Sequence, residues 1–234
     1  MTKRAIVYLD GYNFYYGCLR DSEYKWLDIV QLFRDILRIR DPEISLVKVK
    51  YFTSPALARY ARHGADSEKA QTCYHNALKQ RYNKNKFEII LGKHDLEAVE
   101  LPKAIKGNNK IDRNVKERVW KPVEKKTDIQ IAISMYADAT QNQCDIIVLC
   151  TNDSDMEPVF QRILTDYPTI EIGFVAAARS STNGTPAGRQ ANKSLKKLAH
   201  WTRQYIQDAE LTAAQMPTTI NTGRGTVSKP LYWK

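Results

Sequence analysis

Two carboxylates stand two residues apart in the segment Thr151-Asn152-Asp153-Ser154-Asp155, which directly follows the apolar run Cys144 to Cys150. Such a run predicts a buried strand, and open α/β sheets place their sites at the carboxyl ends of their strands. Pro158 has no backbone N–H, so it fits the first turn of a helix that starts almost at once. Asp153 and Asp155 should therefore share one strand-to-helix turn.

Carboxylates this close repel each other unless a cation lies between them or one stays protonated. Mg²⁺ takes oxygen ligands and is often held by one or two carboxylates together with substrate phosphates. The alternative is structural: one of the acids caps the helix, with Ser154 and Glu157 as a capping box. Because two more acids are expected at strand ends, a metal site is the favoured interpretation for Asp153 and Asp155 together.

Two more acids are expected at the same edge of the sheet. The strand from Arg4 to Leu9 ends at Asp10, and Asp128 lies in the first turn of a helix that is apolar on nearly all sides. The helix dipole keeps Asp128 ionised, which suits a metal site and equally suits capping. Asn13 could orient Asp10, contact a phosphate or form a turn.

The elements that must position these residues alternate between strand and helix, which predicts βαβ units and a parallel sheet. We expect five strands, at 4–9, 44–52, 87–91, 145–150 and 170–176, and helices at 28–39, 66–82, 131–139, 156–164 and 194–206. Asp138 falls on another face of its helix and is expected to contact solvent. The result is an α/β fold with one core.

Two segments break the alternation. Residues 93–126 are polar and basic around the turn Gly107-Asn108-Asn109, and we interpret them as an insertion, a β-ribbon at the rim of the sheet. Residues 207–234 lack sustained periodicity and are expected to form a disordered tail after a domain spanning 1–206. The terminal Tyr232 and Trp233 could stack on bases, although a loose terminus is the simpler interpretation.

The net charge of +10 makes a polyanion the natural partner. The basic residues gather in the insertion and in a loop segment before the last expected helix. These segments could contact nucleic acid, or they could simply form a charged surface exposed to solvent. The candidates for contacting nucleic acid are Lys103, Lys106, Lys110, Arg113, Lys116, Arg118, Arg179, Arg189 and Lys193.

No apolar run approaches the length of a membrane span, and the N-terminus leads into a strand rather than a secretory segment. We therefore expect a cytoplasmic protein with no membrane partner. The four cysteines form no C-x-x-C pair and the four histidines have no metal-ligand spacing, so buried thiols are expected rather than disulfides or zinc. The oligomeric state is left open, a homodimer included.

Four segments follow the order of a known family: Leu9 to Asn13, Lys126 to Asp128, the strand 145–150, and Thr151 to Pro158. They resemble the NYN domain, a branch of the PIN-like metal-dependent nucleases that includes the LabA-like bacterial members, over about residues 3–206. The resemblance implies a three-layer α/β/α fold with a central, mostly parallel sheet. It also implies an acidic pocket for Mg²⁺ or Mn²⁺.

Position by position, the acidic cluster of the family matches Asp10, Asp128, Asp153 and Asp155, and its polar partner matches Asn13. The chain also departs from the pattern. Asn152 stands where glycine is usual, Met156 replaces a common phenylalanine, His200 stands where an acid is often seen, and the basic insertion is not standard. Because the insertion is not part of the family pattern, the resemblance leaves the identity of the substrate undecided.

These features predict a metal-dependent endoribonuclease, because in-line attack of water on a phosphodiester needs metal ions that activate the water and neutralise the phosphate. Asp10 and Asp153 are the expected direct ligands, and Asp128 and Asp155 would act through water. RNA is preferred over DNA on family grounds alone. The alternative is a catalytically silent RNA-binding or scaffold module. A phosphatase of the haloacid dehalogenase type fits less well, because it needs a second aspartate where Tyr12 stands.

Overall fold

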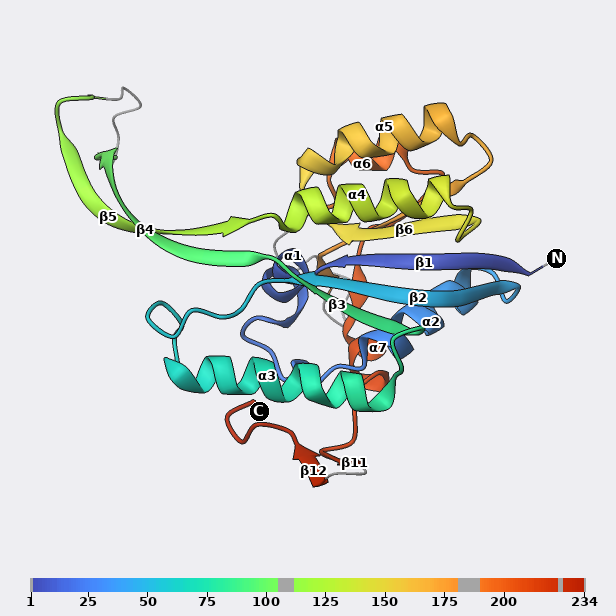
Figure 1. The fold of residues 1–234 in the computed structure, drawn as a ribbon, viewed down its shortest axis with the longest axis horizontal. Helices are drawn as coiled ribbons and strands as arrows, with labels where there is room; N and C mark the ends of the chain where they lie inside the picture. Colours follow the sequence, from blue (N-terminus) through green and yellow to red (C-terminus); the bar gives the residue numbers. More distant parts are fainter. Residues whose placement is uncertain (1, 105–111, 181–189, 223–224, 234) are drawn as a thin grey trace.

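A computed structural model describes residues 2–104, 112–180, 190–222 and 225–233 (Figure 1). At its centre is a six-stranded sheet with the strand order β3-β2-β1-β6-β7-β9, in which every neighbouring pair is parallel. The strands are β1 (Lys3–Asp10), β2 (Ile44–Thr53), β3 (Phe87–Leu91), β6 (Ile146–Thr151), β7 (Glu171–Ala176) and β9 (Trp201–Arg203). The predicted α/β fold with a parallel sheet is confirmed, with one strand more than expected.

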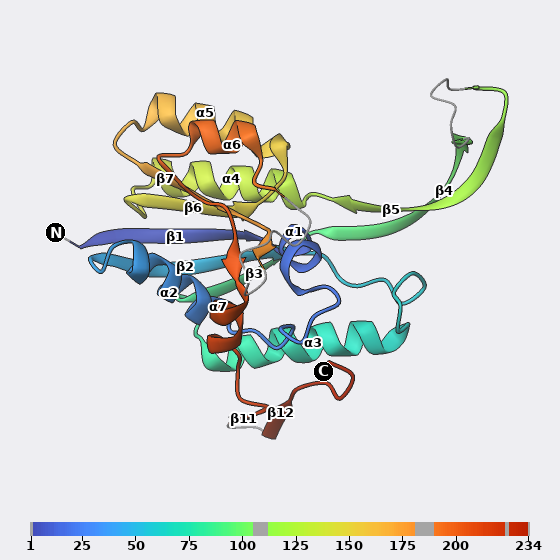
Figure 2. The same ribbon diagram turned by 180° about the vertical axis from the view of Figure 1, so that it is seen from behind.

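Helices cover both faces of this sheet (Figures 1 and 2). One face carries α2 (Ile29–Arg40) and α3 (Ala65–Arg81), and the other carries α4 (Thr127–Thr140), α5 (Glu157–Asp166) and α6 (Lys193–Leu198). Side chains alternate along a strand, so Val7 of β1 packs into one apolar layer while Ile6 packs into the other. No helix in the described ranges is long and apolar enough to cross a membrane.

The central strands β1 and β6 are buried on both faces over most of their length, which is why they contain long apolar runs. All six residues of β6 are buried, and it lies between β1 and β7. The chain leaves β1 through α1 (Gly11–Phe14) and a π-helical turn, η1 (Tyr15–Leu19). Gly17 lets this turn approach the sheet edge, because a Cβ atom there would lie 1.8 Å from the carbonyl oxygen of Ala177.

The segment 194–206, which we expected to be one helix, is divided. After α6 ends at Leu198, β9 joins the sheet beside β7, and β10 (Ile206–Gln207) pairs with β8 (Arg179–Ser180). The side chain of Trp201 lies over Gly173, where a Cβ atom would be 2.1 Å from the indole ring. The indole packed on the bare glycine and the pairing with the edge of β7 outweigh the helical pattern of this segment.

The described residues after 207 do not form the disordered tail that we expected. They form α7 (Asp208–Ala213) and a hairpin of β11 (Thr219–Thr222) and β12 (Gly225–Ser228), with Leu211 and Met216 buried in the core. The indole N–H of Trp26 donates to the carbonyl oxygen of Pro217 at 2.7 Å. The expectation was wrong because these apolar residues are spaced too widely to show a period.

The basic insertion is a β-ribbon, as predicted. Strands β4 (Lys93–Pro102) and β5 (Lys116–Lys125) pair antiparallel from Lys93 opposite Lys125 to Pro102 opposite Lys116. The ribbon extends away from the body of the molecule (Figures 1 and 2). Its second strand leads directly into α4, so the base of the ribbon adjoins Asp128.

Candidate functional site

Asp10 closes β1 and caps the helix that follows it. Its side chain is 3% exposed, and its oxygens accept hydrogen bonds from the backbone N–H of Asn13 at 3.0 Å, the amide of Asn13 at 2.7 Å and the hydroxyl of Thr151 at 2.8 Å. Burial raises the pKa of Asp10, while these hydrogen bonds oppose the rise. Of the roles considered for Asn13, the structure shows one: its side-chain amide donates to Asp10 and orients that carboxylate.

Thr151 connects the two strand ends. Its buried hydroxyl donates to Asp10 and accepts from the backbone N–H of Asp153 at 3.1 Å. Asp153 caps the 3₁₀ turn η2 (Ser154–Met156) by accepting from the backbone N–H of Asp155 at 3.0 Å. Asp153 and Asp155 therefore share one turn, as the sequence predicts, and Asp153 rather than Ser154 is the capping residue.

Asp128 lies across from this turn, in the first turn of α4. Partial burial, followed by the negative charges of Asp10, Asp153, Glu124 and Asp155, raises the pKa of Asp128 to about 6. In the structure, the negative charges of Asp10, Asp153 and Asp155 thus all act on the carboxylate of Asp128. The structure also adds Glu124, at the end of β5, which accepts a hydrogen bond from the hydroxyl of Thr127 at 2.7 Å.

Sequence reasoning missed both Thr151 and Glu124 as parts of the site. Thr151 carries a recognisable signal, because a hydroxyl residue two positions before an aspartate at a strand end can cap the same turn. Glu124 carries none, since it lies within a charged run and only the path of the ribbon places it beside Asp128.

The donor set suits a cation that is held by few protein ligands. Among the described residues, no three carboxylate, imidazole or thiol groups lie close enough together to enclose one ion. A carboxylate has about four lone-pair sites, and the three hydrogen bonds to Asp10 leave room for one more partner. Partial burial and the neighbouring carboxylates raise the pKa of Asp128, so a cation beside these acids would stabilise their ionised forms. These properties fit Mg²⁺ or Mn²⁺, which keep waters and take substrate phosphates as further ligands.

The predicted nucleic-acid contacts are dispersed. In the ribbon, Lys103, Arg113, Lys116 and Arg118 lie toward the end away from the sheet, and Lys103 is only 3.8 Å from Glu117. Lys193 begins α6, next to Asn192, whose backbone and side chain bond to Asn152 in the acidic turn. Lys106, Lys110 and Arg189 lie outside the described residues.

Arg179 is bound within the fold instead of facing the acids. Its side chain lies 3.5 Å from Asp208 and over the ring of Tyr24, at 5.6 Å from the centroid. The prediction that it contacts nucleic acid therefore has little geometric support, because its charge is already matched by the C-terminal segment.

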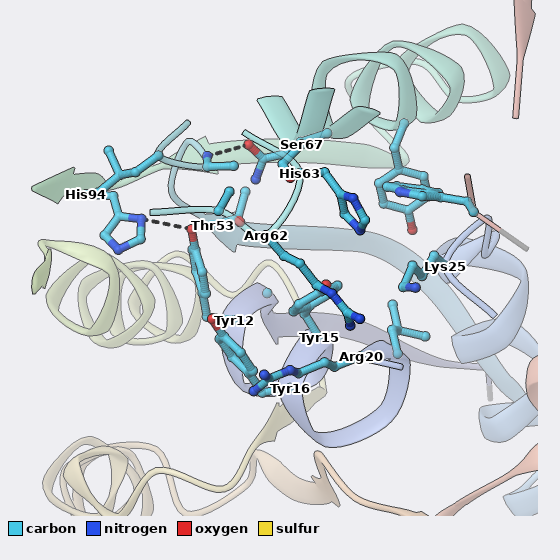
Figure 3. A pocket seen from close by; sticks show the side chains of 18 of the residues that line it. Tyr12, Tyr15, Tyr16, Arg20, Lys25, Thr53, Arg62, His63, Ser67 and His94 are labelled. Atoms are coloured by element: carbon cyan, nitrogen blue, oxygen red, sulfur yellow. Dashed lines mark hydrogen bonds between the residues drawn. The ribbon is translucent and has the colours of Figure 1, made fainter. Parts of the chain in front are cut away.

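A tyrosine-lined pocket of about 660 Å³ adjoins the acidic site. Gly11 and Tyr12, which directly follow Asp10, form part of its wall, and His94 at the base of the ribbon forms another part. The hydroxyl of Tyr12 is hydrogen-bonded to Nδ1 of His94 at 3.0 Å (Figure 3). The sequence signal for this pocket was the run of tyrosines at 12, 15 and 16, to which we assigned no role.

The chain belongs to the NYN domain family, whose model matches residues 4–187. The acidic cluster at the carboxyl edge of the parallel sheet lies within this match, and so does the whole ribbon. The family is one of nucleases, in agreement with the resemblance noted from the sequence.

A curated relative is 36% identical over 245 residues, a match that covers 98% of this chain and 75% of the relative. It is the protein of Pseudomonas putida named 6-hydroxy-3-succinoylpyridine 3-monooxygenase HspA. A solved structure of a Vibrio parahaemolyticus protein of unknown function covers 88% of this chain and 94% of its own, at 15% identity and a TM-score of 0.49. That last likeness carries no argument about function.

Proposed function

We propose that this protein is a metal-dependent nuclease that cleaves RNA phosphodiester bonds at the acidic cluster. The observation that carries the proposal is the convergence of Asp10, Asp128, Asp153 and Asp155 at one edge of the sheet, where partial burial and the negative charges of the neighbouring acids raise the pKa of Asp128. Membership of a nuclease family and the net charge of +10 support a nucleic-acid substrate. RNA is the class implied by the family resemblance.

Each acid has a place in this chemistry. Asp10 and Asp153 would hold Mg²⁺ or Mn²⁺, which supplies charge neutralisation at the phosphate and lowers the pKa of bound water. Asn13 and Thr151 fix the orientation of Asp10 through their hydrogen bonds. Asp128, with a pKa of about 6, is suited to accept a proton from an attacking water near neutral pH.

The test is the cleavage of labelled tRNA, rRNA and single-stranded DNA with Mg²⁺, Mn²⁺ or a chelator. We expect metal-dependent cleavage of RNA by the parent chain and none by Asp153→Asn, which removes one ligand charge from a partly exposed turn without changing its size. Asp35→Asn, on α2, is the matched control and should cleave normally. Binding without metal-dependent cleavage would instead support the silent RNA-binding module.

A second candidate function is the monooxygenation of a small pyridine compound. The observation that favours it is the name of the relative with 36% identity, together with the tyrosine-lined pocket beside the acids. The test is incubation with 6-hydroxy-3-succinoylpyridine, dioxygen and a reduced nicotinamide donor, with substrate loss and donor oxidation measured together. Consumption of both by the parent chain, with RNA left intact, would favour this function over the nuclease.

A further inference from the structure

The tyrosine-lined pocket is built from several separate parts of the chain, β2 and α3 among them. The turn formed by α1 and η1 supplies Tyr12, Tyr15 and Tyr16, the loop before α3 supplies Arg62, the ribbon base supplies His94, and the C-terminal segment supplies Tyr232. Tyr232 is held in place by its hydroxyl, which donates to the carbonyl oxygen of Asp66 at 2.6 Å, and by its ring, 4.8 Å from that of His63. The concavity is therefore a built feature of the fold.

Aromatic surface remains exposed in this pocket. Tyr16 is 45% exposed and Tyr60 is 54% exposed. The ring of Tyr12 stacks on that of Tyr16 at 6.0 Å between centroids, and the guanidinium of Arg20 lies 5.3 Å from the centroid of Tyr16. Exposed tyrosine rings beside a cation offer a surface for another planar ring that carries a negative charge. A cavity of about 660 Å³ lies within the range of small-molecule sites.

Positive charge gathers at the same pocket. Arg20, Lys25 and Arg62 project toward one part of it in Figure 3. Asp21 is the one acidic residue among the described lining residues, and it forms ion pairs with both arginines, at 3.5 Å from Arg20 and 3.4 Å from Arg62. Lys25 has no ion-pair partner in the described part of the chain. Three cations against one carboxylate leave an excess of positive charge that an anionic ligand would neutralise.

We propose that this pocket binds a small molecule that combines a planar aromatic ring with an anionic group. The ring packs against the exposed tyrosine rings, those of Tyr16 and Tyr60, and the anion lies at Arg20, Lys25 and Arg62. Two sources share this chemistry, a nucleoside monophosphate and an aromatic carboxylic acid. The inference holds for either function proposed above, because it concerns binding alone.

The experiment is calorimetric titration of the full chain in the presence of a chelator, so that the acidic cluster takes no part. The probes are uridine 5′-monophosphate, pyridine-3-carboxylate, their neutral counterparts uridine and pyridine-3-carboxamide, and inorganic phosphate. We expect at least one ring-plus-anion probe to bind about tenfold more tightly than its neutral counterpart and than phosphate. Tighter binding of the nucleotide identifies a nucleotide pocket, and tighter binding of the carboxylate identifies an aromatic-acid pocket.

Two variants test the two halves of the pocket. Lys25→Gln combined with Arg62→Gln should weaken the charged probe about tenfold and leave the neutral counterpart unchanged. Tyr16→Ala should weaken both probes about fivefold or more, because part of the aromatic surface that contacts the ring is lost. Arg38→Gln, an exposed position on α2, is the matched control and should bind as the parent does.

The proposal is overturned if neither ring-plus-anion probe binds at concentrations up to about 10 mM, or if phosphate alone binds as tightly. It is also overturned if the pocket variants, shown to be folded by circular dichroism, bind the probes as the parent chain does. These outcomes depend on binding alone, so they test the pocket whether the protein is a nuclease or an oxygenase.

Discussion

Asp128 connects the electrostatics of the site to the stability of the fold. Its folded-state pKa of about 6 lies above the ordinary aspartate value, so the folded protein binds a proton more tightly than the unfolded chain does. The contribution to stability is fully present below about pH 4 and is lost as the pH rises through about 6. Above that pH, the ionised carboxylate repels its neighbours.

Asp128→Asn should therefore stabilise the metal-free protein at pH 8 and have little effect at pH 4. Solvent screening reduces the repulsion to on the order of 1 kcal/mol, which corresponds to a rise in Tm of about 2–4 °C at pH 8. Thermal unfolding in a chelator at the two pH values measures this difference. An equal effect of the substitution at both pH values would show that Asp128 does not sense the other acids.

Asp138 shows what the residue types alone could not reveal. We expected it at the surface, but it is 7% exposed and lies in an ion pair, with the Nζ atom of Lys50 2.6 Å from its carboxylate. The hydroxyl of Tyr8 donates to the same oxygen at 2.5 Å. Only the packing of α4 across β1 and β2 creates this contact, so helical periodicity misplaced the residue.

Asp138→Ala should lower the free energy of unfolding by about 3 kcal/mol, because it leaves the ammonium of Lys50, whose side chain is only 13% exposed, without a counter-charge. Urea unfolding followed by circular dichroism measures the change. Glu88→Ala is the control, since its pair with Lys48 is more exposed and should contribute less than about 1 kcal/mol. Equal losses in the two variants would mean that the buried pair has no special role.

At the scale of elements, prediction succeeded where burial imposes a long pattern. The continuous apolar run of β6 and the helical spacing of apolar residues in α2 are both visible in the sequence. It failed for β9, which has three residues and owes its pairing to the edge of β7. The site followed the same rule, because Asp10 ends β1 and Asp153 lies two residues after β6, whereas Glu124 depends on the course of the ribbon.

The ribbon carries the next prediction. Four basic residues lie toward the far end of the ribbon in the described part of the chain: Lys103, Arg113, Lys116 and Arg118. Replacing all four by glutamine should weaken RNA binding more than it slows turnover at saturating RNA. Each phosphate contact that is lost should flatten the slope of log affinity against log salt by about 0.7 for single-stranded RNA. Filter binding over a salt series measures affinity and slope together.

The control for that variant replaces four cations on α3, α2 and the loops nearby, at Arg38, Lys79, Lys84 and Lys229. It changes the net charge by the same amount away from the ribbon. If both variants lose affinity equally, the effect belongs to the overall charge. If the ribbon variant keeps the affinity and slope of the parent chain, the ribbon is a solvated arm.

At the scale of the whole molecule, the C-terminal segment is part of the apolar core on one face of the sheet. Leu211 of α7 is fully buried within the same apolar layer as α2 and α3. Leu211→Ala should therefore destabilise the fold by about 2–5 kcal/mol, as expected for a large-to-small change in a packed core. Chemical denaturation measures it, and Leu231→Ala, at 95% exposure, should be nearly neutral. A neutral Leu211→Ala would restore the picture of a dispensable tail.

The contour of the ribbon also defines a ruler for substrates. Its ten facing pairs span nine steps, or roughly 30 Å at about 3.4 Å per residue, between the acids at its base and the cations toward its far end. A helical nucleic-acid strand that rises about 3.4 Å per nucleotide along its axis covers that distance in about nine nucleotides. Oligonucleotides much shorter than this would reach the acids without reaching the far cations, so cleavage efficiency should rise at a threshold length and then level off.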